Sequence, residues 1–202
     1  MLSILEGSNA VKFARDIIES HVTNKHPKSF ELGPSFDQNR GVFVTLNTFP
    51  DHKLRGCIGI PEPVMPLKNA LASAAKSATK DPRFNKLEID ELKKIVIEVT
   101  ILTKPEKIAV NSPKEYMDQV KIGRDGLIVE QGFFKGLLLP QVPVEQKWDL
   151  EEFLSNTCMK AGLPPDAWLD KQTKIYKFEG QIFSEVEPEG QIMEKVANES
   201  GC

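Results

Sequence analysis

The chain has 202 residues, of which 40% are hydrophobic and 27% charged, and its 26 basic and 29 acidic residues give a formal net charge of −3. This ordinary composition excludes collagen-like, low-complexity and wholly disordered classes, and the lack of a long apolar run predicts no membrane-spanning helix. The slight excess of acidic residues argues against nucleic-acid binding driven by overall charge.

The three cysteines, Cys57, Cys158 and Cys202, are odd in number and widely spaced. This pattern fits free thiols in a reducing compartment better than a disulfide framework. The first residues lack the basic and apolar regions of a signal peptide, so a cytoplasmic location is expected. With only three histidines, the sequence predicts no multi-histidine metal site, and no cofactor is expected.

The first half of the chain alternates between helical and strand-like patterns. Apolar residues recur at three- and four-residue steps in the first helix, and a second helix carries a stripe of alanines that lets a neighbour approach closely. Proline and aspartate then end that second helix. The expected elements are a helix at about 8–22, a loop at 26–39, strands at 41–46 and 53–60, a helix from 66 to about 80, and a hydrophobic central strand at 95–102.

The second half is predicted to be rich in hairpins. Gly123–Gly126 is interpreted as a hairpin turn, a strand is expected at 136–139, and Asp149 with Glu152 forms a capping box that opens a helix. A last strand at about 174–184 is followed by a polar tail that is expected to fray. These interleaved elements predict an α+β fold with mostly antiparallel sheets and flanking helices.

The most unusual segment is Leu54–Gly59, with the sequence LRGCIG. On a strand, Arg55 and Cys57 project from the same face, where a guanidinium would favour the thiolate and make Cys57 a candidate nucleophile. Gly56 and Gly59 would leave room for a ligand or another backbone to approach. The alternative is structural: Cys57 is a small buried hydrophobe and the glycines allow tight packing.

Glu98 is a second candidate, because it lies inside the hydrophobic strand 95–102 and needs a partner there. Arg55 is the partner that the sequence suggests, if the two strands share a sheet. An Arg55 neutralised in this way would stabilise a thiolate less. A structural ion pair and a functional pair are both open at this stage.

Two loops add further candidates. Pro140 and Pro143 stiffen a connection that would present Gln141 and Glu145 as binding groups, or that forms only a well-specified turn. The segment Asp81–Phe84 would cap the preceding helix, or Arg83 would bind an anion. Elsewhere, Cys158 falls on the apolar face of its helix and is expected in the core.

Taken together, five motifs resemble the AMMECR family, named for a human chromosomal region, and in particular its stand-alone archaeal members. The resemblance extends from about residue 10 to residue 183. The motifs are Leu54–Gly59, Asp81–Phe84, Gly136–Val142, Trp148–Asp149 and Thr157–Leu163.

The resemblance implies an α+β fold of two subdomains, with residues 1–47 and 105–202 in the larger and residues 48–104, including the RGCIG strand, in the smaller. It also implies a functional link to Memo-like and radical-SAM proteins, but no established reaction. The motif positions that it marks are Arg55, Gly56, Cys57, Gly59, Asp81, Arg83, Pro140, Gln141, Glu145 and Cys158.

Two functions remain open on these grounds. In the first, a small ligand or substrate binds in a cleft between the subdomains, with Cys57 as nucleophile or thiol ligand, Arg55 as anion clamp and Glu145 as acid or base. In the second, the chain is a non-catalytic module that binds a protein or RNA. RNA binding would need a segregated basic patch, for which the candidates are Lys76, Lys80, Arg83 and Lys86.

Overall fold

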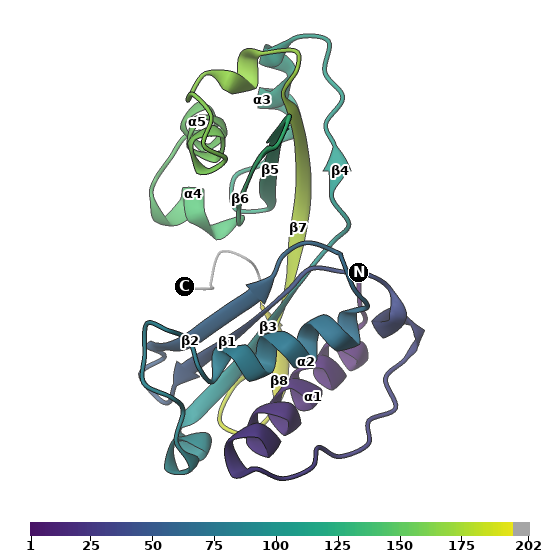
Figure 1. The fold of residues 1–202 in the computed structure, drawn as a ribbon, viewed down its shortest axis with the longest axis vertical. Helices are drawn as coiled ribbons and strands as arrows, with labels where there is room; N and C mark the ends of the chain where they lie inside the picture. The colour runs from purple at the N-terminus through teal and green to yellow at the C-terminus, as the bar shows by residue number, and fades with distance from the viewer. Residues whose placement is uncertain (196–202) are drawn as a thin grey trace. The chain divides into compact units, whose positions relative to one another are not determined.

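The computed structural model describes residues 1–195, and these fold into two compact units (Figure 1). Unit 1 contains residues 1–102 and 181–195, and unit 2 contains residues 103–180. This division differs from the one expected from the sequence, which separated residues 48–104 from the rest. Strand β1 (Val42–Thr48) pairs along its length with β2 (Leu54–Ile60), so a boundary between residues 47 and 48 would split a continuous sheet.

Unit 1 is an antiparallel sheet with two long helices. Its strand order is β2-β1-β3-β7, and β8 pairs with β7. The expected α+β class is confirmed. The remaining elements of unit 1 are α1 (Ile4–Thr23), η1 (Pro34–Asp37), α2 (Leu67–Ala78), η2 (Ile89–Lys94), β3 (Ile95–Leu102), the end of β7 (Lys174–Glu185) and β8 (Ile192–Lys195).

Helix α1 begins at Ile4, four residues earlier than the apolar periodicity predicts. The Ser3 side chain accepts a hydrogen bond from the Glu6 amide, and the Glu6 carboxylate accepts one from the Ser3 amide. This capping box satisfies two amides that would otherwise lack partners, so the helix extends to that point. Asn24, in the left-handed conformation, ends the helix after Thr23.

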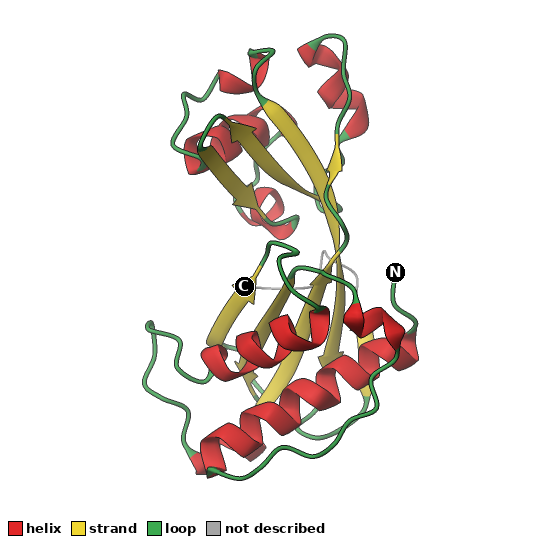
Figure 2. Ribbon diagram, turned by 45° about the vertical axis from the view of Figure 1, so that its right-hand side comes forward, coloured by secondary structure: helices red, strands yellow, loops and turns green. Residues whose placement is uncertain are grey.

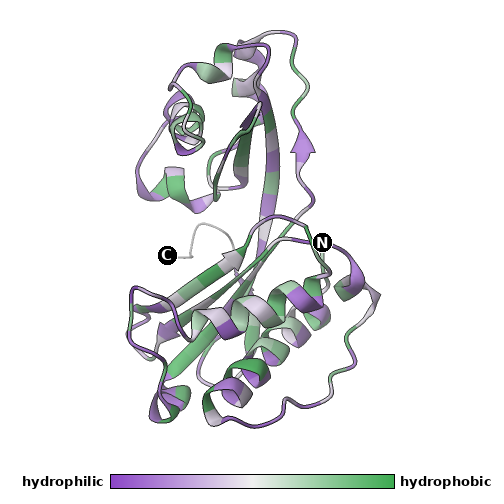
Figure 3. Ribbon diagram, viewed as in Figure 1, coloured by the Kyte–Doolittle hydropathy of each residue, from purple (hydrophilic) through white to green (hydrophobic). Residues whose placement is uncertain are grey.

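Both long helices cover the same face of the unit 1 sheet (Figures 1 and 2). The alanine stripe of α2 is confirmed, because its alanines are buried beside the aliphatic side chains of β1 and β3. Hydrophobic residues accordingly run along these strands (Figure 3). The fully buried residues shared by this core include Ala14, Ile18, Val44, Leu46, Ala70, Ala74, Ile97 and Val99.

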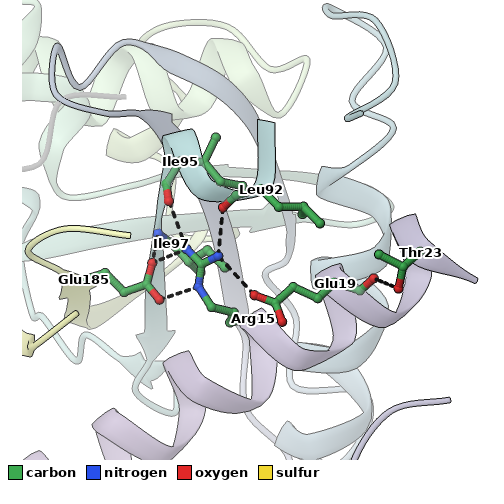
Figure 4. Close-up of polar contacts among 7 residues, drawn as sticks. All are labelled: Arg15, Glu19, Thr23, Leu92, Ile95, Ile97 and Glu185. Atoms are coloured by element: carbon green, nitrogen blue, oxygen red, sulfur yellow. Dashed lines mark hydrogen bonds and ion pairs between the residues drawn. The ribbon is translucent and has the colours of Figure 1, made fainter. Parts of the chain in front are cut away.

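A buried ion pair fastens α1 to the end of β7 (Figure 4). The Arg15 guanidinium donates to both carboxylate oxygens of Glu185, at 2.6 and 2.5 Å, and also to the carbonyls of Leu92 and Ile95. Glu185 in turn accepts from the Ile97 amide. The desolvated charges are therefore compensated by well-placed hydrogen bonds.

Unit 2 has its own sheet and core. Here β7 pairs with β4 and β5, and β5 pairs with β6, all antiparallel. Helix α5 opens at the predicted Asp149 capping box. The elements of unit 2 are β4 (Glu106–Lys107), η3 (Pro113–Glu115), α3 (Tyr116–Gln119), β5 (Asp125–Gln131), β6 (Phe134–Leu138), α4 (Gln141–Glu145), α5 (Leu150–Lys160), η4 (Ala167–Leu169) and the start of β7.

Two local predictions are corrected by the structure. The hairpin turn is not Gly123–Gly126, because β5 begins at Asp125 and the chain reverses at Gly132 and Phe133 instead. Gly132 has a positive φ of 59°, which this tight turn requires. The polar tail also does not simply fray after residue 184, since residues 192–195 form β8. Within residues 1–195, no helix has the length and apolar character needed to cross a bilayer.

Candidate functional site

The RGCIG segment forms β2, an edge strand of unit 1 that pairs with β1. Its side chains alternate as predicted: Ile58 and Ile60 pack against the helix-covered core, so Cys57 projects from the face opposite α1 and α2. Cys57 is partly exposed. A thiol on this strand is therefore placed beside other residues of the face opposite the two helices rather than in the aliphatic core.

A polar row crosses that face at the level of Cys57. Thr45 of β1 lies between Cys57 of β2 and Glu98 of β3 and pairs with both. The Thr45 hydroxyl and the Cys57 thiol are 3.1 Å apart and share a hydrogen bond. At the other end of the row, Lys195 of β8 donates to Glu98 at 2.9 Å.

This arrangement corrects the suggested pairing of Glu98 with Arg55. Glu98, with 3% of its surface exposed, pairs with Lys195, whereas Arg55 pairs with Glu91 of η2 at 2.7 Å. The sequence could not reveal the Lys195 partner, because 97 residues separate it from Glu98 and the tail in which it lies looked unstructured.

Arg55 is committed to several contacts at once. Its guanidinium forms two hydrogen bonds with the Glu91 carboxylate, and these hold the pKa of Glu91 below its usual value. Arg55 also donates to the carbonyl of Lys86 and stacks near the Phe84 ring. Because Glu91 compensates its charge, Arg55 is weaker as an anion clamp or as a stabiliser of a Cys57 thiolate.

The segment Asp81–Phe84 binds the free edge of β2. The Asp81 carboxylate accepts from the Cys57 amide at 2.8 Å, and the Arg83 guanidinium donates to the Cys57 carbonyl at 3.3 Å. Arg83 also forms hydrogen bonds with Asp81 that hold the pKa of this carboxyl well below its usual range. Side chains thus satisfy backbone groups of an edge strand that would otherwise lack partners. This corrects the suggestion that the segment Asp81–Phe84 caps α2, whose C-cap residue is Thr79.

The two motif glycines are explained by packing. A Cβ at Gly56 would lie 2.5 Å from the carbonyl oxygen of Ala78 in α2, so only glycine allows the helix this close to the strand. A Cβ at Gly59 would lie 2.2 Å from the Phe43 ring. These contacts give both glycines a structural reason for their presence.

A buried side-chain oxygen without a hydrogen-bond partner lies on the same face as Cys57. Asn47 is two residues beyond Thr45 on β1, so the two side chains project from the same face of the sheet. The register with β3 agrees, because Thr45 pairs with Glu98 and Asn47 pairs with Val96, which are also two residues apart. Asn47 is 6% exposed, and within residues 1–195 its buried Oδ1 atom has no hydrogen-bond partner. Such an atom costs about 1–3 kcal/mol unless something donates to it. Sequence reasoning missed Asn47, and a polar residue near the end of a buried strand was the signal that could have found it.

The remaining sequence candidates lie in unit 2. Gln141 and Glu145 belong to α4, with Pro140 as its N-cap residue, so this segment is a short helix and not the loop that was expected. Cys158 is fully buried among the core residues of α5, which confirms its predicted packing role. Burial raises the pKa of its thiol to about 11. Cys202 lies outside the described residues.

Cavities and metal sites give no separate support to the RGCIG segment. A cavity of about 550 Å³ lies elsewhere in unit 1, beside Asp16, Glu19 and Leu92. Among the described residues, no group of three or more histidine, cysteine or acidic side chains is arranged to hold a metal ion.

Comparisons with known proteins place these observations in a family. The AMMECR1 family model matches residues 11–183. Protein MJ0810 of Methanocaldococcus jannaschii is 57% identical over 196 residues, covering 96% of this chain and 98% of that protein. A crystal structure of an uncharacterized protein, PH0010 from Pyrococcus horikoshii, superposes with a TM-score of 0.81 at 47% identity, covering 96% of this chain and 98% of that one.

Proposed function

The chain belongs to the AMMECR1 family, and from this premise we propose that the sheet face around Cys57 and Asn47 in unit 1 binds a small ligand. The observation that carries the proposal is the buried Oδ1 atom of Asn47, which has no hydrogen-bond donor among the described residues. An acceptor that is desolvated without a partner is destabilising, and a ligand that donates to it would offset that cost.

The neighbourhood of Asn47 supports a ligand of defined chemistry. Thr45 lies at the level of Cys57, and Asn47 is two residues further along β1, so the Asn47 side chain and the Cys57 thiol are on neighbouring strands and two steps apart, roughly 6.6 Å along the strand axis. A ligand that reaches across the two strands would donate an N–H or O–H to Asn47 and contact the partly exposed sulfur of Cys57. The proposed ligand is therefore small and polar, with at least one hydrogen-bond donor.

The catalytic roles suggested by the sequence stay predictions. Cys57 keeps its place as candidate nucleophile, but the contribution of Arg55 to its reactivity is reduced by the Glu91 pair. The roles of Pro140, Gln141 and Glu145 as partners of this face, and the link to Memo-like and radical-SAM proteins, are likewise predictions.

The test measures how fast each thiol of the native protein is alkylated by iodoacetamide, with the modified peptides resolved by mass spectrometry. We expect Cys57 to be labelled at least tenfold faster than Cys158, which is fully buried and has a raised pKa. Cys158 is thus an internal control in every sample. A Cys57 that is labelled only on unfolding would contradict the proposal, since no ligand could reach it.

A second measurement addresses the nucleophile. The rate for Cys57 is followed from pH 6 to pH 10 and compared with that of a model thiol. A nucleophilic Cys57 reacts faster than the model thiol at neutral pH, because only the thiolate attacks. A rate equal to or below that of the model thiol would remove the nucleophilic role and leave binding alone.

A second candidate function, the non-catalytic interaction module, is favoured by the structural use of the motif. Arg55 holds η2 through Glu91, and Asp81 and Arg83 hold the edge of β2. In this case Cys57 and the glycines maintain the shape of a surface. A protected Cys57 in the alkylation experiment would favour this module over the ligand site.

A further inference from the structure

Two adjoining cavities lie at the C-terminal ends of α1 and α2 in unit 1, away from the RGCIG segment. The first has a volume of about 200 Å³ and lies beside Lys25 and Lys76. The second has a volume of about 280 Å³ and lies beside Lys80 and Lys86. His21 lines both cavities and so marks the point where they meet.

All the ionisable side chains that line these cavities are basic. They are His21, Lys25, Lys76, Lys80 and Lys86, which are called the basic cluster below; among the described residues, no aspartate or glutamate lines either cavity. The four lysines are exposed, and within residues 1–195 none of them forms an ion pair. A set of like charges without counter-charges attracts anions.

Lysines at the ends of helices also have a structural explanation, because they complement the negative end of the helix dipole. Comparing the charge of the helix ends with the charge of the lysines decides between this structural explanation and anion binding. The C-termini of α1 and α2 each carry about −0.5 charge, roughly −1 in total, against four lysines. An excess of about three positive charges therefore remains at the basic cluster.

The lowered pKa of His21 agrees with this excess of positive charge. Burial lowers its pKa from the usual value, and the charges of Lys80 and Lys76 lower it further. The groups that face it from the neighbouring elements are Lys76 of α2, Lys80 after α2, Lys86 beyond it and Lys25 after α1. The charges that lower the pKa of His21 therefore come from Lys80 and Lys76.

We propose that the basic cluster binds a small anion with two or more phosphate groups, one group near each cavity and His21 between them. Lysine ammonium groups bind phosphate as point charges, and spaced charges fit a ligand whose own charges are spaced along a chain. Among the described residues, no phenylalanine, tyrosine or tryptophan lines either cavity and the one ring there is the imidazole of His21, so the site offers no broad platform for stacking a nucleobase. Recognition is therefore of the phosphates.

This site is independent of the one proposed around Cys57. Three of its lysines, Lys76, Lys80 and Lys86, were candidates for a basic patch in the sequence. The fourth candidate, Arg83, is instead engaged with Asp81 and the Cys57 carbonyl. The sequence could not place His21 and Lys25 in the cluster, because they come from a different helix.

The test is calorimetric titration of the intact protein with sodium tripolyphosphate at 50 and 150 mM salt. We expect binding that weakens as salt rises, and a loss of at least tenfold in affinity for Lys76→Met/Lys80→Met. Methionine keeps helix propensity, and circular dichroism checks the fold of the variant. The matched control is Lys160→Met/Lys171→Met, which removes the same charge from exposed positions in unit 2 and should change affinity less than twofold.

A second readout follows His21 by NMR. Bound phosphates replace a positive surrounding with a negative one, so tripolyphosphate should raise the pKa of His21. The proposal fails if both double variants lose affinity equally, because the binding is then only nonspecific charge attraction. It fails equally if a single-stranded RNA binds at this cluster while tripolyphosphate does not, because the occupant is then a polynucleotide.

Discussion

The two faces of the unit 1 sheet differ in how completely their polar groups are satisfied. On the face covered by α1 and α2, the core is aliphatic, and the charged pair of Arg15 and Glu185 makes hydrogen bonds with its surroundings (Figure 4). On the opposite face, Thr45, Glu98 and Asn47 are also buried, yet Oδ1 of Asn47 has no partner among the described residues.

The difference teaches which face is used for stability and which for binding. A buried polar group that is fully paired fixes the packing around it, whereas one that is left unpaired is destabilising. Natural proteins keep such local inconsistencies mainly at functional positions. The covered face therefore stabilises unit 1, and the opposite face is where we expect a ligand to bind.

The largest expected effect comes from breaking the covered face. Arg15→Met leaves Glu185, at 4% exposure, as a buried charge without its cation. Removing one partner of a buried pair typically destabilises by about 3–5 kcal/mol. The free energy of unfolding, measured from urea titrations followed by circular dichroism, should fall by that amount.

Two further variants make this prediction specific. Arg15→Met/Glu185→Gln removes the stranded charge and keeps an amide oxygen for the Ile97 amide, so it should recover much of the loss. The exposed pair of Lys94 and Asp90 is the matched control, and Lys94→Met should leave the free energy of unfolding almost unchanged, because surface ion pairs contribute little. If Arg15→Met were no worse than Lys94→Met, the covered face would not depend on its ion pair.

A smaller loss of stability is expected at the free edge of the sheet, where Asp81 contacts β2. Asp81→Asn weakens the bonds from the Cys57 amide and from Arg83, so we expect a loss of about 2 kcal/mol at pH 7. The pKa of Asp81 is lowered in the folded protein, chiefly by its hydrogen bonds from Arg83. Its contribution is therefore present above the unfolded pKa, near 3.9, and is lost as the pH falls through the folded pKa.

The pH dependence separates this role from a general effect of charge. The difference in unfolding free energy between the wild type and Asp81→Asn should be constant from pH 7 to about pH 5 and narrow below about pH 4. Asp118→Asn, at an exposed position in unit 2, should show no such difference. If the difference in unfolding free energy between the wild type and Asp81→Asn stayed constant down to pH 2, the Asp81 charge would not stabilise the edge of β2.

Much of the fold could be predicted because local patterns determine it. The apolar steps of α1, the alanines of α2 and the run Ile95–Leu102 each predict the element that the structure contains. Boundaries were missed where a side-chain cap or a distant partner decides, as at Ser3, which starts α1 early, and at β8, whose pairing with β7 orders the tail.

The candidate site was less predictable because it depends on pairing between distant residues. Strand alternation correctly put Cys57 opposite the core, and the sequence rightly singled out Glu98 as a charge that needs a partner. It chose Arg55 for that role, although Lys195 fills it and Glu91 takes Arg55. Register determines these choices, and no short motif in the sequence encodes the register between β1 and β3.

The smallest expected effect has the opposite sign and concerns the face opposite the two helices. Asn47→Val removes the unpartnered Oδ1 atom and places a β-branched side chain beside Val96 on β3. We expect the free energy of unfolding, measured in urea, to rise by about 1 kcal/mol. Such a gain would mean that the asparagine is retained at a cost in stability.

Thr45→Val is the matched control, because it makes a similar change on the same strand and face. The Thr45 hydroxyl is bonded to Cys57, so its loss should destabilise by about 1 kcal/mol instead. If Asn47→Val also lost stability, the amide would be satisfied in the isolated protein and the argument for a ligand at this face would fall. Opposite signs for these two substitutions on one strand would place the unsatisfied group at Asn47 and not at Thr45.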